Sequence, residues 1–147
     1  MKFYYFSYLF SMGFGIGKFP LFPGTIASLL TLPVIWYLNK ILEFKTLLIL
    51  IFFYTLISIY FVNICIKNLK DKDPKYIIVD EQIGQAVALL FCDQKIVEFL
   101  ISFILFRIFD IIKPFPINYV DKIKNSLGVI LDDILAGIFV CILFLLI

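Results

Sequence analysis

Residues 46–66 read TLLILIFFYTLISIYFVNICI, a run of 21 residues that contains no charged side chain. A helix needs about 20 predominantly apolar residues to cross a bilayer, so this run predicts a membrane-spanning helix. The whole chain agrees with that prediction, because 63% of its 147 residues are hydrophobic, only 16% are charged and the mean hydropathy is +1.05. We therefore expect one all-α domain, residues 1–147, that is integral to a membrane.

Outward from this run, the apolar pattern predicts four further helices, at residues 24–38, 74–91, 96–112 and 127–147. Three of them are short or interrupted by charge. We expect a bundle of about four to five helices, some of them short or re-entrant. At the start of the helix predicted over 74–91, the third along the chain, Asp73 before Pro74 is typical of an N-cap followed by proline in the first turn. The N-terminal aromatic stretch has no small-residue cleavage site after it, so we expect it to be retained.

Five carboxylates lie inside the apolar stretches, and four of them form adjacent pairs. They are Asp80, Glu81, Asp110, Asp132 and Asp133. Insertion scales put a charge at a helix centre at about 2.5–3.5 kcal/mol, so each carboxylate is a candidate functional residue. The lysine-rich segments 67–75 and 113–124 are predicted to face the cytoplasm. Helices that alternate in direction between these segments bring all five carboxylates to one depth, which predicts a single site at the cytoplasmic end of the bundle.

The residue types restrict the chemistry of this site. The chain has no histidine, its three cysteines are widely spaced and form no CxxC pair, and none of the three is followed six residues later by an arginine. This excludes phosphohistidine chemistry, Ser-His-Asp triads, histidine-ligated zinc and a cysteine-dependent phosphatase loop. Five carboxylates against Arg107 and Lys113 leave an excess of negative charge. Oxygen-only ligands favour a hard divalent cation, so the set predicts a Mg²⁺ site.

Two neighbouring segments offer candidates for binding an anion, and each has a structural alternative. Arg107 and Lys113 lie three residues on either side of Asp110. They can form an intrahelical ion pair at the membrane edge, or leave Asp110 to a metal and bind phosphate themselves. The glycine- and proline-rich stretch 13–28 leads into a helix whose first N–H groups can bind an anion, with hydroxyls from Thr25 and Ser28. Its alternative is an interfacial turn in which Thr25 is the N-cap.

Taken together, these motifs resemble the phosphatidylglycerophosphatase A family, Mg²⁺-dependent membrane lipid phosphatases of bacteria. The resembling blocks are residues 14–17 with Pro20 and 23–25, residues 78–81 with Gly84, residues 106–110 with Lys113, Pro114 and Pro116, and residues 132–133 with Ala136 and Gly137. The chain departs from the family pattern at residues 125–128, where members often carry a histidine and two glycines, and at Ala27, where glycine is usual.

The resemblance implies removal of the terminal phosphate from phosphatidylglycerophosphate, which gives phosphatidylglycerol in the last step of its synthesis. It implies a multi-pass protein of the bacterial inner membrane, with the active site facing the cytoplasm, an inner-leaflet phospholipid as substrate and no nucleic-acid partner. The implied roles are as follows: Asp80, Glu81, Asp110, Asp132 and Asp133 hold Mg²⁺ and act in catalysis, and Lys18, Thr25, Ser28, Arg107 and Lys113 bind phosphate. Both direct attack by water, with one carboxylate as base, and an aspartyl-phosphate route are open.

Two other functions fit an acidic membrane site. A carboxylate-lined cation transporter would place its acids near the bilayer midplane and often contains inverted repeats, neither of which the sequence indicates. A lipid phosphotransferase would use metal-bound aspartates, but the chain lacks the Asp-Gly and Ala-Arg pattern of the CDP-alcohol transferases. The sequence predicts no oligomeric state.

Overall fold

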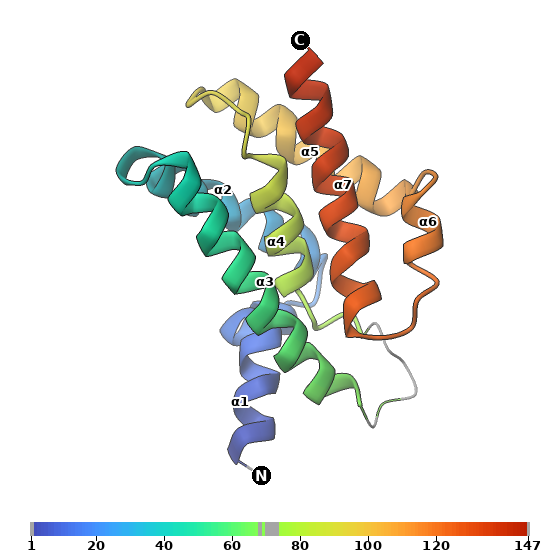
Figure 1. Ribbon diagram of the computed structural model, residues 1–147. Coiled ribbons are helices and arrows are strands. Elements are labelled where there is room, and N and C mark those ends of the chain that lie inside the picture. Colours follow the sequence, from blue (N-terminus) through green and yellow to red (C-terminus); the bar gives the residue numbers. More distant parts are fainter. Residues whose placement is uncertain (1, 68, 70–73, 147) are drawn as a thin grey trace.

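The computed structural model describes residues 2–67, 69 and 74–146, and every regular element in these ranges is a helix (Figure 1). The elements are α1 (Lys2–Ser11), the 3₁₀ helix η1 (Gly13–Lys18), α2 (Pro23–Ile41), α3 (Phe44–Ile66), α4 (Val79–Ala88), α5 (Ile96–Ile112), α6 (Ile117–Val120) and α7 (Ser126–Leu146). The predicted all-α class is confirmed, although the described part contains more helices than the five that the sequence indicated.

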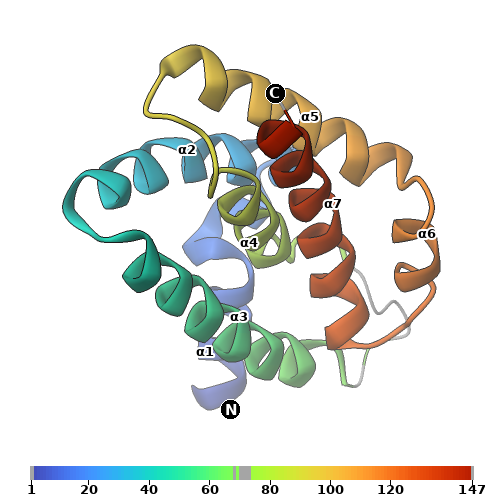
Figure 2. The same cartoon turned by 45° about the horizontal axis from the view of Figure 1, so that its top comes forward.

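The short helix α4 lies at the centre of the bundle. Figure 2 shows it enclosed by α2, α3, α5 and α7, and it contacts all four, α7 most extensively. Two glycines make the α4–α7 contact close. A Cβ on Gly137 would lie 2.4 Å from the carbonyl oxygen of Gly84, and a Cβ on Gly84 would lie 2.6 Å from the carbonyl oxygen of Asp133. The two backbones therefore approach as closely as small residues allow.

Two helices, α3 and α7, are long and apolar enough to cross a membrane. Only 17% of the most apolar part of α3 is buried, so most of its side chains face outward, where lipid can cover them. Helix α4 has ten residues and is about 15 Å long, half of a hydrocarbon core of about 30 Å. The expectation of a short helix inside the bundle is thus confirmed, and the whole is consistent with a membrane protein.

The third predicted helix is wrong at both ends, because α4 begins at Val79 and ends at Ala88. The N–H groups of the two residues before Val79 already donate to other backbone carbonyls. The N–H of Ile78 donates to the carbonyl of Ser11 at 3.0 Å, and the N–H of Ile77 donates to the carbonyl of Pro74 at 2.9 Å. The N-cap of α4 is Ile78, while the N-cap predicted at Asp73 falls outside the described residues.

The N-terminal segment forms a helix that the sequence analysis did not predict. Helix α1 packs along α3 (Figure 1). The contact is aromatic, with the ring centroids of Phe10 and Phe61 separated by 4.8 Å. The following η1 then rests on the segment before α4, since a Cβ on Gly17 would lie 2.0 Å from the carbonyl oxygen of Tyr76. Together with the hydrogen bond from Ile78 to Ser11, this contact fixes where α4 starts and hence where its first acidic residues lie.

Candidate functional site

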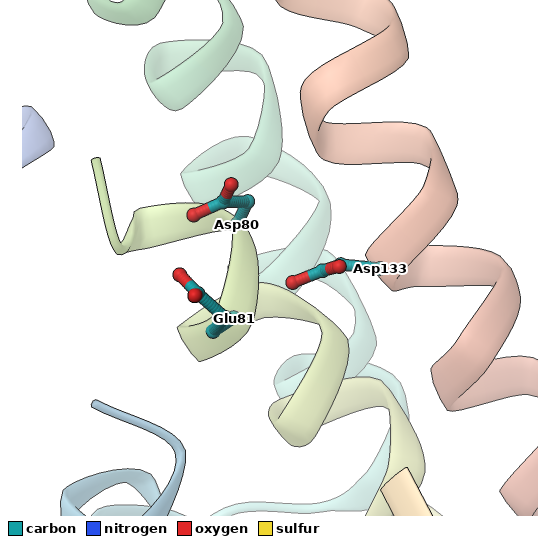
Figure 3. Close-up of side chains that lie close together, drawn as sticks. All are labelled: Asp80, Glu81 and Asp133. Atoms are coloured by element: carbon teal, nitrogen blue, oxygen red, sulfur yellow. The ribbon is translucent and has the colours of Figure 1, made fainter. Parts of the chain in front are cut away.

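Three of the five predicted carboxylates meet where α4 and α7 cross. Asp80 and Glu81 come from the first turn of α4, and Asp133 reaches toward them from α7 (Figure 3). One oxygen of each carboxylate lies within 4.8 Å of the other two. Asp80 is 6% exposed and Asp133 is 4% exposed, so the cluster is largely withdrawn from solvent. The sequence prediction that separate helices contribute acids to one place is therefore met by these three residues.

This acidic cluster fits a divalent cation. Glu81 Oε2 and Asp133 Oδ2 are both buried, and neither accepts a hydrogen bond from any described residue. A buried carboxylate oxygen without a donor is costly, and neighbouring carboxylates also repel one another. A divalent cation among the three groups would satisfy these oxygens and cancel much of their charge, and a set of oxygen ligands alone selects a hard ion. The residues present are thus a possible metal site.

The start of α2 lies directly against Glu81. A Cβ on Gly24 would lie 1.9 Å from Glu81 Oε1, so only glycine leaves room for the carboxylate here. The positive end of the α2 dipole favours a negative charge at this position. The N-cap of α2 is Phe22, with φ of 51°, and Pro23 follows it as the first helical residue. Thr25 therefore lies inside the first turn, and the alternative that made it the N-cap is wrong.

Arg107 connects α5 to this corner of the molecule. Its Nη1 forms an ion pair with Asp110 Oδ2 at 2.7 Å and donates to Ser28 Oγ at 3.5 Å. Ser28 Oγ in turn donates to the carbonyl oxygen of Gly24 at 3.0 Å. The buried Nε of Arg107 has no acceptor in the described part of the chain, so a donor is available for an incoming anion. The intrahelical ion pair that the sequence allowed is present, and Asp110 lies close enough to interact electrostatically with Glu81.

The adjacent aspartates of α7 face different partners. Asp132 Oδ2 lies 2.6 Å from Lys113 Nζ, and the same ammonium pairs with Asp121 after α6. Lys113 thereby ties the end of α5 to α7, and the structure does not bring Asp132 into the acidic cluster. Burial lowers the pKa of Lys113, but the hydrogen bonds and charges of the two aspartates outweigh it and the net pKa is raised. Because the lysine pKa is raised, the ion pairs of Lys113 stabilise the fold fully at neutral pH. This stabilisation is lost only as pH rises through the raised pKa.

Replacing Lys113 with methionine should therefore lower thermal stability. The change removes the Lys113 ammonium from Asp132, whose side chain is only 5% exposed, and we expect a loss of about 1–3 kcal/mol. The measurement is the unfolding midpoint in detergent, with Lys124→Met at an exposed position as the matched control. Adding Asp132→Asn to Lys113→Met should recover part of the loss. Equal midpoints for Lys113→Met and Lys124→Met would contradict this role for the ion pair.

Two features of the region differ from the sequence analysis. Lys18 is exposed, with its Nζ 5.8 Å from the centre of the Tyr8 ring, and no contact with the acidic cluster is seen in the part of the chain that the structure describes. Tyr54 was missed: its hydroxyl donates to Gln82 Oε1 at 2.6 Å, directly beside Glu81. A tyrosine within an uncharged apolar run carries no signal that would single it out.

A model of the phosphatidylglycerophosphatase A family matches residues 9–147. Phosphatidylglycerophosphatase A of Escherichia coli K12 is 32% identical over 133 residues, which cover 89% of this chain and 77% of the relative. The protein of the same name from Haemophilus influenzae is 34% identical and covers 92% and 84%. A Bacteroides thetaiotaomicron protein named "Putative phosphatidylinositol-3-phosphatase" is 36% identical and covers 92% and 89%. No solved structure matches the chain. On the family match and these identities, the chain belongs to the phosphatidylglycerophosphatase A family.

Proposed function

We propose that this protein hydrolyses the terminal phosphate monoester of phosphatidylglycerophosphate and releases phosphatidylglycerol and phosphate. The observation that carries the proposal is the buried convergence of Asp80, Glu81 and Asp133, in a chain of this family with two helices apolar enough to cross a membrane. A phosphate monoester needs positive charge around it, and a cation on these carboxylates together with Arg107 would supply that charge.

The metal in this proposal is Mg²⁺, held by Asp80, Glu81 and Asp133, with Asp110 and Asp132 beside them. When bound, such a cation polarises the phosphoryl group and offsets its charge. Arg107 binds phosphate oxygens through its buried Nε, for which the described residues provide no acceptor, while Ser28 and Thr25 lie on the first two turns of α2, beside the acidic cluster. Lys113, held by Asp132, adds positive charge near the end of α5.

In the reaction, a water oxygen bonds to phosphorus and the bond from phosphorus to the glycerol oxygen breaks. One carboxylate accepts the proton of the water, and the leaving oxygen takes up a proton. The aspartyl-phosphate route differs in that a carboxylate oxygen attacks first. A single turnover with substrate that carries ³²P in its terminal phosphate, stopped in acid, distinguishes them: the covalent route traps the label on the protein, whereas direct attack leaves it only in the lipid and in free phosphate.

The proposed setting is the inner membrane of a bacterium, with several spans and the acidic cluster toward the cytoplasm, which is the leaflet where the substrate is expected. The lysines at 67–75 and 113–124 support this orientation. A single cysteine introduced at Asn125 tests it, because the three native cysteines are buried. A membrane-impermeant maleimide should label it in inverted vesicles and not in intact cells, and the reverse pattern would reject the orientation.

The function is tested on the purified protein in detergent, by following phosphate release from phosphatidylglycerophosphate. We expect turnover with Mg²⁺ and none with excess EDTA. Phosphatidylinositol 3-phosphate is the second substrate to assay, because the name of the Bacteroides relative points to that head group. Faster release from the inositol lipid would replace the proposed substrate, and no release from either lipid would reject the phosphatase.

Gly24→Ala should weaken both cation binding and turnover. A methyl group at this position would lie 1.9 Å from Glu81 Oε1, so either the carboxylate or the start of α2 must move. A misplacement of about 1 Å at a reacting centre costs about 10²-fold in turnover. The measurement is kcat as a function of Mg²⁺ concentration, with Ala27→Gly as a control that removes a methyl from the same helix. A wild-type Mg²⁺ profile in Gly24→Ala would show that the contact has no part in the site.

A further inference from the structure

An apolar groove lies beside the acidic cluster, between α2 and α3, with α4 as its floor. Its volume is about 370 Å³. The lining includes Leu30, Val34 and Leu38 of α2, Leu50 of α3, and Gln82 and Ala86 of α4. The few hydroxyl groups in the groove are already engaged, because Thr31 donates to the carbonyl of Ala27 and Tyr54 donates to Gln82. The groove therefore offers an apolar surface to a ligand.

The groove and the acidic cluster both lie against the same two helices, α2 and α4. Gln82, which lines it, directly follows Glu81 in α4. The start of α2 lies against Glu81 at Gly24, and about 21 Å further along the same helix Leu38 lines the far part of the groove. The two helices stay together beyond the cluster, since Leu32 and Ile35 of α2 share a core with Ala86 of α4. A ligand whose phosphate lies at the cluster can thus extend along α2 into the groove.

The groove is also open toward the apolar exterior of the bundle. Its rim residues Leu30, Val34 and Leu50 are 46%, 56% and 45% exposed. Leu50 belongs to α3, the candidate span whose apolar side chains are mostly turned outward. If lipid covers α3, a hydrocarbon chain can enter the groove sideways without crossing water.

We propose that the groove binds one acyl chain of the phospholipid whose phosphate reacts at the acidic cluster. The proposal rests on the proposed function and adds a subsite to it. A volume of about 370 Å³ is at the small end of the range of about 300–1,000 Å³ for ligand cavities, which suits a single chain. The acyl chain moves from one apolar environment, the lipid, to another, the groove. The groove therefore contributes to the reaction mainly by aligning the phosphate with the acidic cluster.

Filling the groove tests this subsite. Val34→Trp and Leu50→Trp add bulk from the exposed rim, and Leu29→Trp and Ile49→Trp make the same change at exposed positions of the same helices that do not line the groove. We expect the two groove variants to lower kcat/KM for phosphatidylglycerophosphate about tenfold and to leave hydrolysis of its deacylated head group unchanged. The two control variants should match the wild type on both substrates.

The outcomes separate this inference from the function on which it rests. Groove variants that equal their controls, with the wild type active, would reject the acyl subsite and leave the phosphatase intact. If the wild type releases no phosphate, binding is read instead by photocrosslinking with phosphatidylglycerophosphate that carries a diazirine near one chain end. Labelling of α2 and α3 that Val34→Trp abolishes would support the subsite. Equal labelling by a phosphatidylcholine with the same diazirine would mean bulk lipid only and overturn it.

Discussion

Asp133→Asn should abolish most phosphate release, lowering kcat by at least about 10²-fold, while the helical content and the unfolding midpoint are kept. The amide nearly preserves the shape of the side chain but removes one of the three charges in the acidic cluster. Loss of one preorganised electrostatic group at a reacting centre typically costs about 10²–10³-fold in kcat. Stability should not fall, because the substitution also removes a buried charge that lies against two others. The measurement is kcat at saturating Mg²⁺, together with calorimetric titration of Mg²⁺ binding.

Two matched variants make this result specific. Asp93→Asn neutralises an exposed carboxylate that pairs with Lys95, and it should retain wild-type turnover. Asp132→Asn changes the neighbouring residue, whose oxygen faces Lys113, and it should cost less turnover than Asp133→Asn. Retention of more than about a tenth of the activity in Asp133→Asn would contradict the assignment of this residue. So would a larger loss in Asp132→Asn.

Gly84→Val should remove activity and stability together. A Cβ at this position would lie 2.6 Å from the carbonyl oxygen of Asp133 and 2.6 Å from the ring of Phe106, neither of which can move cheaply. The branched side chain would push α4 away from α7, and with it Asp80 and Glu81 away from Asp133. Overpacking of this kind costs about 1–3 kcal/mol.

The unfolding midpoint and kcat are measured for Gly84→Ala and Gly84→Val. Both quantities should fall further in the valine variant than in the alanine variant. Leu131→Val places a branched side chain on an exposed position of α7 and serves as the control. If Gly84→Val unfolds at the wild-type temperature with full turnover, then the close α4–α7 contact does not position the cluster.

The acidic residues could be found from the sequence because a charge inside an apolar helix is expensive and therefore informative. The choice between Asp132 and Asp133 could not. Neighbours on a helix point about 100° apart, so which one faces α4 depends on where α4 packs. Asp121, which holds Lys113 together with Asp132, lies after a four-residue helix and shows no pattern of its own.

In the fold, too, features set by the local sequence could be predicted, whereas features set by contacts between distant residues could not. The bounds 96–112 of α5 were predicted because the segment is mostly apolar and Pro114 cannot continue a helix. The start of α4 was missed, since it depends on a hydrogen bond from Ile78 to Ser11, which is 67 residues away in the chain. Helix α1 was missed because a uniformly aromatic stretch has no periodicity that marks a helix. The groove likewise depends on how α2 and α3 diverge, and its lining residues are ordinary apolar side chains.

We propose above all that Asp80, Glu81 and Asp133 share one divalent cation. The most direct test is a crystal structure of the protein grown with Mn²⁺, in which anomalous scattering locates the ion. We expect one anomalous peak between the three carboxylates, at the oxygen distances of about 2.0–2.6 Å that hard cations adopt, and loss of that peak in Asp133→Asn. A peak at another place, or none among these carboxylates in an active protein, would contradict it.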